Sequence, residues 1–97
     1  MKAEELAQLW APLFQAWSME HVVPESSDTE VQALVALWLS RAPYPTPGKR
    51  APMPVTTPML ARLAEVHVRG RHEAGVFRLE VHLVPIAAAM LKVAPIP

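Results

Sequence analysis

The chain of 97 residues contains no cysteine. This absence excludes disulfide scaffolds, thiolate zinc sites and cysteine nucleophiles together. It is compatible with a reducing compartment and argues against a small secreted domain stapled by disulfides, so we expect a cytoplasmic protein. The length is typical of one small domain, and we therefore expect residues 1–97 to form a single unit.

Glycine is also scarce, and two of the three glycines, Gly70 and Gly75, lie in one short segment. They do not form a phosphate-binding loop, and no serine lies in a nucleophile elbow. A run of about 18 apolar residues, which a membrane span requires, is missing. The N-terminus carries Glu4 and Glu5 where a signal peptide has a basic start. We therefore expect no cofactor, no membrane span and no enzymatic activity.

The net charge is zero, but the charges are unevenly distributed. Residues 1–40 hold six acidic side chains and one lysine, whereas residues 41–78 hold seven basic and two acidic ones. Such an imbalance can mark a nucleic-acid contact. However, the basic half has no dense Lys/Arg cluster and no interleaved exposed aromatic residues. We therefore favour acidic and basic halves that face each other, within one chain or across a dimer, over nucleic-acid binding.

The first 42 residues predict two helices. Apolar residues recur with helical spacing between residues 3 and 19, although Pro12 interrupts this stretch and predicts either a kink or two short helices. Ser27 and Glu30 form a capping box before a second apolar stripe that ends near Arg41 and Pro43. With facing stripes and a short connection, the two helices are expected to pack as an antiparallel pair over residues 3–42.

Residues 43–58 are rich in proline and predict a linker or an extended arm. The segment Leu63–Val84, LAEVHVRGRHEAGVFRLEVHLV, then alternates apolar and polar residues, which is typical of a β-hairpin. We expect a loop of residues 72–75, with His67 opposite Glu80 and Glu65 opposite His82, because this register pairs opposite charges. Residues 86–93 predict either a short helix or a third strand.

The polar face of this hairpin is the one candidate for metal or acid–base chemistry. Strand alternation places two carboxylates and two imidazoles there, and such groups can hold a divalent metal or move a proton: Glu65, His67, Glu80 and His82. A flat two-stranded face does not enclose an ion or exclude water, and His and Glu are ordinary residues on a solvent-exposed face. We therefore favour a solvated face over a metal or catalytic site, and over a nucleic-acid contact made by the neighbouring arginines.

The apolar positions of the hairpin also resemble a known family. Leu63, Val66 and Val68, followed by residues 79–83 and an apolar segment at 86–91, resemble the C-terminal substrate-specificity-switch domains of hook- and needle-length regulators in type III secretion. The resemblance covers less than half of the chain. The Leu-Gly pair associated with that family's first strand reads Leu63-Ala64 here, and no residue roles are carried over.

Together these features predict an α+β fold, with an N-terminal antiparallel helical pair, a Pro-rich connector and a hairpin with a short tail over residues 59–97. Apolar residues make up 52% of the chain, which is high for its length, and a lone hairpin leaves two open edges. Both features predict a protein partner or a homo-oligomer. We therefore expect a non-enzymatic interaction or assembly module, with contact candidates on the helices, the hairpin and the tail: Trp10, Trp17, Trp38, Phe77, Leu79, Val81, Met90 and Leu91.

Overall fold

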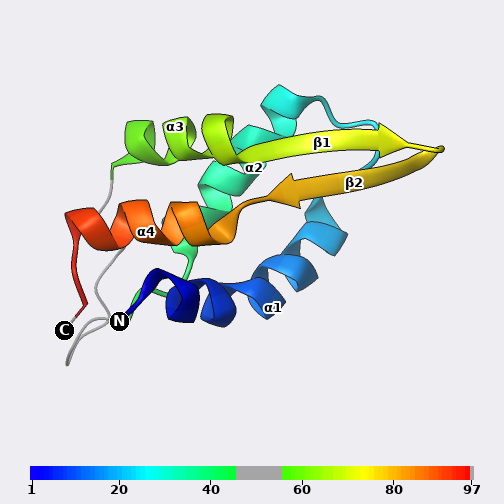
Figure 1. Cartoon of the computed structure of the whole chain (residues 1–97). Coiled ribbons are helices and arrows are strands. Elements are labelled where there is room, and N and C mark those ends of the chain that lie inside the picture. Colours follow the sequence, from blue (N-terminus) through cyan, green and yellow to red (C-terminus); the bar gives the residue numbers. More distant parts are fainter. Residues whose placement is uncertain (46–55, 97) are drawn as a thin grey trace.

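The computed structural model describes residues 1–45 and 56–96. In these described residues, four helices and one antiparallel hairpin follow one another: α1 (Ala3–His21), α2 (Asp28–Arg41), α3 (Thr57–His67), β1 (Val68–Glu73), β2 (Val76–Val81) and α4 (Leu83–Val93). Figure 1 shows that α3 leads directly into β1 and that β2 leads directly into α4, so the hairpin extends from one end of these helices. The predicted α+β class is confirmed.

Helix α1 continues without interruption through Pro12. Proline removes the N–H that would bond to the carbonyl four residues earlier, that of Gln8. Pro12 and Gln8 are both exposed, so water can donate a hydrogen bond to the Gln8 carbonyl in place of the missing N–H. Of the two alternatives that the sequence left open, the structure has one helix and not two short ones.

Helix α2 begins with the predicted capping box. The Ser27 hydroxyl accepts a hydrogen bond from the Glu30 amide at 3.2 Å, and it donates to the Glu30 carboxylate at 3.3 Å. The helix ends at Arg41, two residues before Pro43. The predicted start and end of this helix are therefore confirmed.

The two N-terminal helices contact each other through aromatic side chains. Trp10 of α1 is fully buried and lies edge-on to Trp38 of α2, with ring centroids 6.1 Å apart. Phe14 approaches the same Trp38 ring at 5.1 Å. The closest backbone neighbour of α1, however, is α4, and that of α2 is α3. Large aromatic side chains therefore separate the backbones of α1 and α2, and α3 and α4 pack beside this pair to complete the core.

Residues 43–45 of the predicted Pro-rich arm lie against the core. The Trp10 indole donates to the Pro43 carbonyl at 2.8 Å, and the buried Tyr44 hydroxyl donates to the Ala94 carbonyl at the end of α4. At its other end the predicted arm is helical, because α3 begins at Thr57 with Pro58 in its first turn. Residues 46–55 of the arm lie outside the described residues.

Burial of Tyr44 predicts an alkaline loss of stability. Burial raises the pKa of the Tyr44 phenol above its ordinary value of 10.0. At pH values between the pKa of Tyr44 in the unfolded chain and its higher pKa in the folded chain, the folded state binds more protons. The contribution of Tyr44 to the free energy of unfolding is therefore full below about pH 10 and decreases as pH rises above it. Tyr44→Phe removes this component and costs about 1 kcal/mol at neutral pH, since the Ala94 carbonyl loses its donor. Urea titrations of both proteins from neutral to alkaline pH measure the difference, and parallel pH profiles would contradict it.

The first strand of the hairpin begins later than predicted. Residues 63–67 belong to α3, because Leu60 and Ala64 lie one turn apart on its buried face and Leu63 is half-buried beside them. Val66, predicted to face the core, is 59% exposed. The sequence LAEVH fits both periodicities, and packing of α3 against α2 selects the helix. The undecided tail is helical too, since α4 covers Leu83–Val93.

The hairpin register also differs from the prediction. The turn is two residues long, with positive φ at Ala74 (50°) and Gly75 (78°), as a type I′ turn requires. Val68 pairs with Val81 and Arg69 with Glu80, a shift of two residues from the predicted pairing. A two-residue shift leaves each side chain on its own face. Phe77, Leu79 and Val81 therefore share one apolar face as expected, and only their cross-strand partners were wrong.

Candidate functional site

The polar face that the sequence offered for metal or acid–base chemistry is not assembled. Glu65 and His67 are in α3, whereas Glu80 is in β2 and bonds to Arg71 at 3.1 Å. His82 precedes α4 and lies opposite His67, whose carbonyl accepts from the His82 amide at 3.1 Å. Within residues 1–45 and 56–96, no group of three or more His, Asp or Glu side chains is placed to hold a metal ion. The one-face arrangement of these four residues assumed a strand where the chain is helical.

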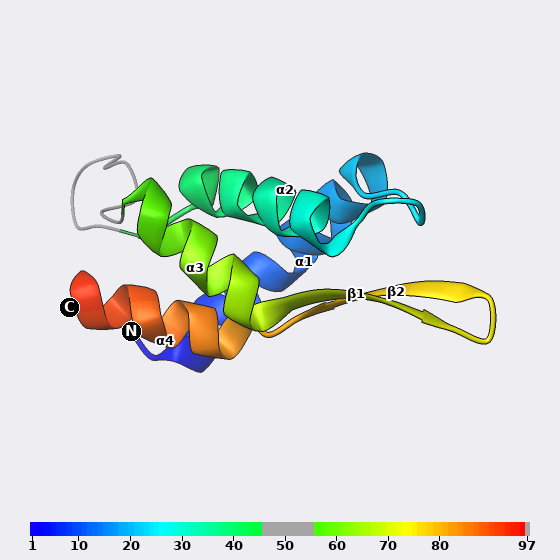
Figure 2. The same cartoon turned by 90° about the horizontal axis from the view of Figure 1, so that it is seen from above.

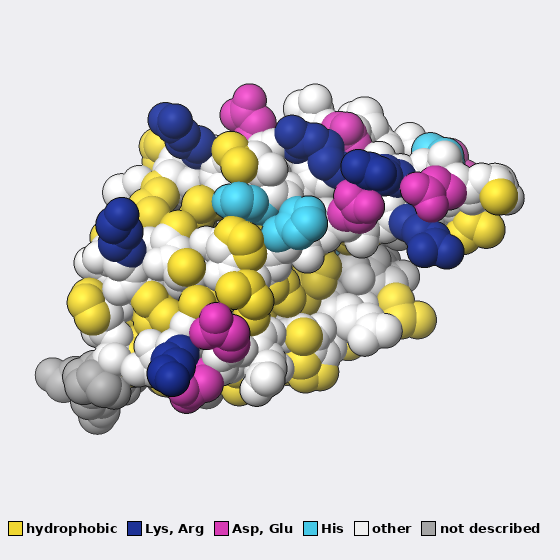
Figure 3. Space-filling view, viewed as in Figure 1, with side chains coloured by type: hydrophobic (Ala, Val, Ile, Leu, Met, Phe, Trp, Pro, Cys, Tyr) yellow, Lys and Arg dark blue, Asp and Glu magenta, His cyan; other side chains and the backbone are white. Residues whose placement is uncertain are grey.

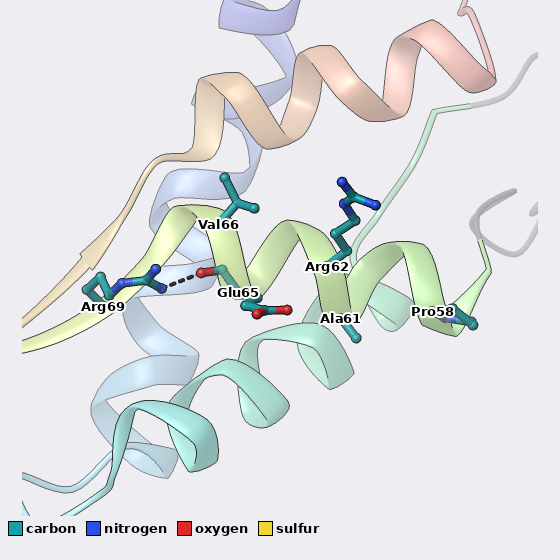
Figure 4. A pocket seen from close by; sticks show the side chains of 6 residues that line it. All are labelled: Pro58, Ala61, Arg62, Glu65, Val66 and Arg69. Carbon is teal, nitrogen blue, oxygen red and sulfur yellow. Dashed lines mark hydrogen bonds between the residues drawn. The ribbon is translucent and has the colours of Figure 1, made fainter.

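An open depression of about 630 Å³ lies on the outer face of α3. Figure 4 shows its lining, which comes from α3 and the start of β1: Pro58, Ala61, Arg62, Glu65, Val66 and Arg69. The Arg69 guanidinium is already engaged, because it donates to the Glu65 carbonyl and to the Val68 carbonyl at the end of α3. It thus acts as a C-terminal helix cap. Arg62 and Glu65 point in different directions in Figure 4, so the depression presents no converging groups.

A second, smaller hollow of about 290 Å³ lies between the end of α1 and α2. Trp17 forms one wall, with the His21 ring stacked on it at 5.1 Å, and the exposed Leu37 lies on the side of α2. The His21 Nδ1 atom lies 2.9 Å from the Trp17 carbonyl, so this histidine caps the C-terminal end of α1. Four of its lining side chains are apolar, His21 and Arg41 are the other two, and Trp17 is half-buried at its rim.

The predicted contact residues divide into two groups. Trp10, Trp38 and Met90 are buried in the core of this chain, so a partner cannot reach them in the folded protein. The others are half-buried and keep part of their surface accessible: Trp17, Phe77, Leu79, Val81 and Leu91. Three of these five lie on β2, which makes this strand the densest group of accessible candidates.

The outer edge of β1 is closed by two side chains of α2. The Asp28 carboxylate accepts from the Gly70 amide at 2.9 Å, and the Gln32 side-chain amide donates to the Val68 carbonyl at 3.2 Å. Asp28 and Gln32 are four residues apart, so they lie on the same face of the helix. Gly70 suits this contact, because a Cβ atom there would lie 3.0 Å from the Phe77 ring and 3.3 Å from the Asp28 carboxylate. Helix α2 therefore covers the β1 edge at Val68 and Gly70 and blocks an added strand there.

The outer edge of β2 has no such cover. The hydrogen bond from His82 to His67 marks a bonded pair, and bonded pairs alternate with non-bonded pairs along an antiparallel ladder. The N–H and C=O groups of Phe77, Leu79 and Val81 therefore point away from β1. Among residues 1–45 and 56–96, none of these groups has a hydrogen-bond partner outside the hairpin, and the main neighbour of β2 is β1 itself.

The distal part of this edge also stands clear of the helices. Figures 1 and 2 show from two directions that the turn end of the hairpin extends past the ends of the surrounding helices. Figure 3 shows Lys/Arg and Asp/Glu side chains interleaved along the hairpin and α3. The salt bridge between Arg71 and Glu80 lies within this mixed surface. A surface of mixed sign suits a protein contact better than a phosphate backbone.

The two residues that close the β1 edge were not predicted as functional. The sequence analysis singled out neither Asp28, which lies between the capping-box residues, nor Gln32 in the second helix. Their signal in the sequence is a polar pair at helical spacing, which is common on exposed helix faces. Their role depends on a strand 36 to 42 residues further along the chain, so only the tertiary structure reveals it.

The chain matches no protein-family model, no curated protein and no solved structure. The resemblance to type III secretion switch domains thus gains no support, and two of its positions, Leu63 and Val66, lie in α3 and not in a strand. Within the part of the chain that the structure describes, no helix has the length and apolar character to cross a membrane.

Proposed function

We propose that this protein is a non-enzymatic interaction module that binds other protein chains by strand addition at the β2 edge. The observation that carries the proposal is the asymmetry of the hairpin. Asp28 and Gln32 close one edge, whereas the outward groups of Phe77, Leu79 and Val81 lack a hydrogen-bond partner among the described residues. Proteins commonly cover or blunt exposed edges, and an edge left open serves as a template for a further strand.

The side chains of β2 support the same function. Phe77, Leu79 and Val81 are half-buried on one face, so an added strand can extend the apolar layer that they begin. Arg78 and Glu80 alternate with them on the other face and supply charges that can select a partner and its register. Within residues 1–45 and 56–96, no group of three or more His, Asp or Glu side chains is placed to hold a metal ion, so a metal-dependent function has no supporting geometry there.

Site-specific photo-cross-linking in living cells tests this function. Val76, at the turn end of β2 and 57% exposed, is replaced by benzoylphenylalanine (Val76→benzoylphenylalanine). The control carries the same group at Ala61, an exposed position on α3 that lines the depression described above. We expect a discrete adduct from position 76 and none from position 61. A folded protein that gives no adduct from position 76, or equal adducts from both, would contradict a contact surface on the hairpin.

A further inference from the structure

We propose that the occupant of the β2 edge is a second copy of this chain, paired antiparallel about a two-fold axis through Leu79. This inference rests on the proposed function and names its partner. The two hairpins then form one continuous four-stranded sheet with the order β1–β2–β2–β1. Because the contact is isologous, the same residues serve both copies and the assembly closes as a dimer.

The backbone restricts the possible registers. Only residues whose N–H and C=O groups point outward can exchange hydrogen bonds across the new contact, and these are Phe77, Leu79 and Val81. With Leu79 facing Leu79 of the second copy, Phe77 faces Val81 of the second copy, and the converse. All outward groups of the strand are then paired. A change of register by one residue would set Leu79 opposite Arg78 or Glu80 of the second copy, whose N–H and C=O groups point inward, so the hydrogen bonds between the two strands would be lost. Moving the two-fold axis by one residue changes the register by two residues and keeps the outward groups paired.

The charges select one register among those that remain. With Leu79 on the axis, Arg78 faces Glu80 of the second copy, and Glu80 faces its Arg78. Moving the axis to Arg78 sets arginine against arginine, and moving it to Glu80 sets glutamate against glutamate. Opposite charges facing each other stabilise a strand pair, and like charges destabilise it. The β2 sequence VFRLEV is therefore complementary to itself in one antiparallel register.

The arrangement of charges within a single copy also favours this pairing. Arg78 lies opposite Arg71 in the hairpin, whereas Glu80 already bonds to Arg71 at 3.1 Å. The single chain thus leaves Arg78 beside a like charge. Within residues 1–45 and 56–96 no carboxylate forms a salt bridge with Arg78, and Glu80 of a second copy supplies one. On the apolar face, the half-buried Phe77, Leu79 and Val81 gain a matching apolar strand and lose solvent contact.

Charge reversal tests both the partner and the register. Arg78→Glu sets two carboxylates against each other at each end of the contact, yet it gives Arg71 an opposite charge within its own hairpin. We expect this variant to fold at least as stably as the parent chain while its dimer dissociation constant rises by about tenfold or more, equal to about 1.4 kcal/mol. Glu80→Arg weakens the dimer similarly but loses the bond to Arg71, so its folding is checked by circular dichroism.

A mixture of the two variants is the decisive sample. The Arg78→Glu chain is acidic at both positions 78 and 80, and the Glu80→Arg chain is basic at both. Every facing pair in the mixed dimer therefore has opposite charges, so the equimolar mixture recovers the dimer that each variant alone weakens. Arg62→Glu, with the same charge change on α3, leaves the dimer unchanged. Sedimentation velocity of the parent chain, each variant and the mixture over a wide concentration range supplies the measurement.

The outcomes separate the two proposals. A parent dimer, weakened by each single reversal and recovered by mixing, supports the second copy and this register. A dimer insensitive to both reversals overturns the register, and a monomer at all concentrations overturns the second copy as partner. In the monomer case, an adduct of another mass at position 76 in cells keeps the strand-addition function, whereas its absence removes that function as well.

Discussion

Trp10→Ala lowers the free energy of unfolding by about 3–5 kcal/mol, the range for deleting a large aromatic side chain from a core. The indole of Trp10 is fully buried, lies against Trp38, and donates to the Pro43 carbonyl at 2.8 Å. The substitution therefore opens a cavity and also removes the donor of a part-buried carbonyl. Because small domains are stable by about 5–15 kcal/mol in total, we expect the change to remove a large share of this protein's stability.

Two further variants separate the causes of this loss. Trp10→Phe keeps an aromatic ring and deletes the N–H donor, so it measures the hydrogen bond to Pro43 together with a smaller cavity. Leu13→Ala, on the same helix at a side chain that is 46% exposed, costs much less because little buried surface is lost. Urea denaturation followed by tryptophan fluorescence and circular dichroism gives all three values. A loss from Trp10→Ala no larger than that from Leu13→Ala would show that the core is not built around this indole.

Combined replacement of Asp28 and Gln32 by alanine has the second largest effect. Each residue holds one backbone group of β1, and the Asp28 bond involves a carboxylate, so we expect a loss of about 2–4 kcal/mol in unfolding free energy. Asp28 also lies in the first turn of α2, where its charge is favourable. Losing both side chains frees the β1 edge from its cover.

The same variant changes the state of assembly. With both edges of each hairpin open, the proposed dimer can add strands at either side, and an open-ended sheet replaces a closed pair. Light scattering should therefore detect large species whose size grows with concentration. Glu5→Ala with Gln8→Ala is the control, since it likewise removes one carboxylate and one side-chain amide, here from an exposed face of α1. A variant that keeps the assembly state of the parent chain would contradict the role of α2 in closing the edge.

The sequence predicts the elements of this fold better than their partners. The capping box at Ser27 and the stop before Pro43 are local signals, and both are confirmed. The stretch from Leu63 to His67 fits helical and strand periodicity alike, and only its packing against α2 decides for the helix. Local chemistry thus determines where elements begin and end, whereas ambiguous segments depend on contacts that are remote in sequence.

The candidate site shows the same division. Alternation places Phe77, Leu79 and Val81 on one face in any register that differs by two residues, so the face was predictable and the register was not. Opposite-charge pairing favoured a four-residue loop, whereas the structure has a two-residue turn at Ala74 and Gly75. The difference between an open and a closed edge depends on α2, which no pattern within the hairpin reveals.

Amide hydrogen exchange of the hairpin, measured by NMR as a function of protein concentration, tests the central claim most directly. We predict that the amides of Phe77, Leu79 and Val81 exchange quickly in dilute protein and become protected as concentration rises. The Gly70 amide, bonded to Asp28, should be protected at every concentration. If the three β2 amides are instead protected to the same extent in dilute and concentrated protein, or in neither, the β2 edge is not the open edge through which this protein assembles.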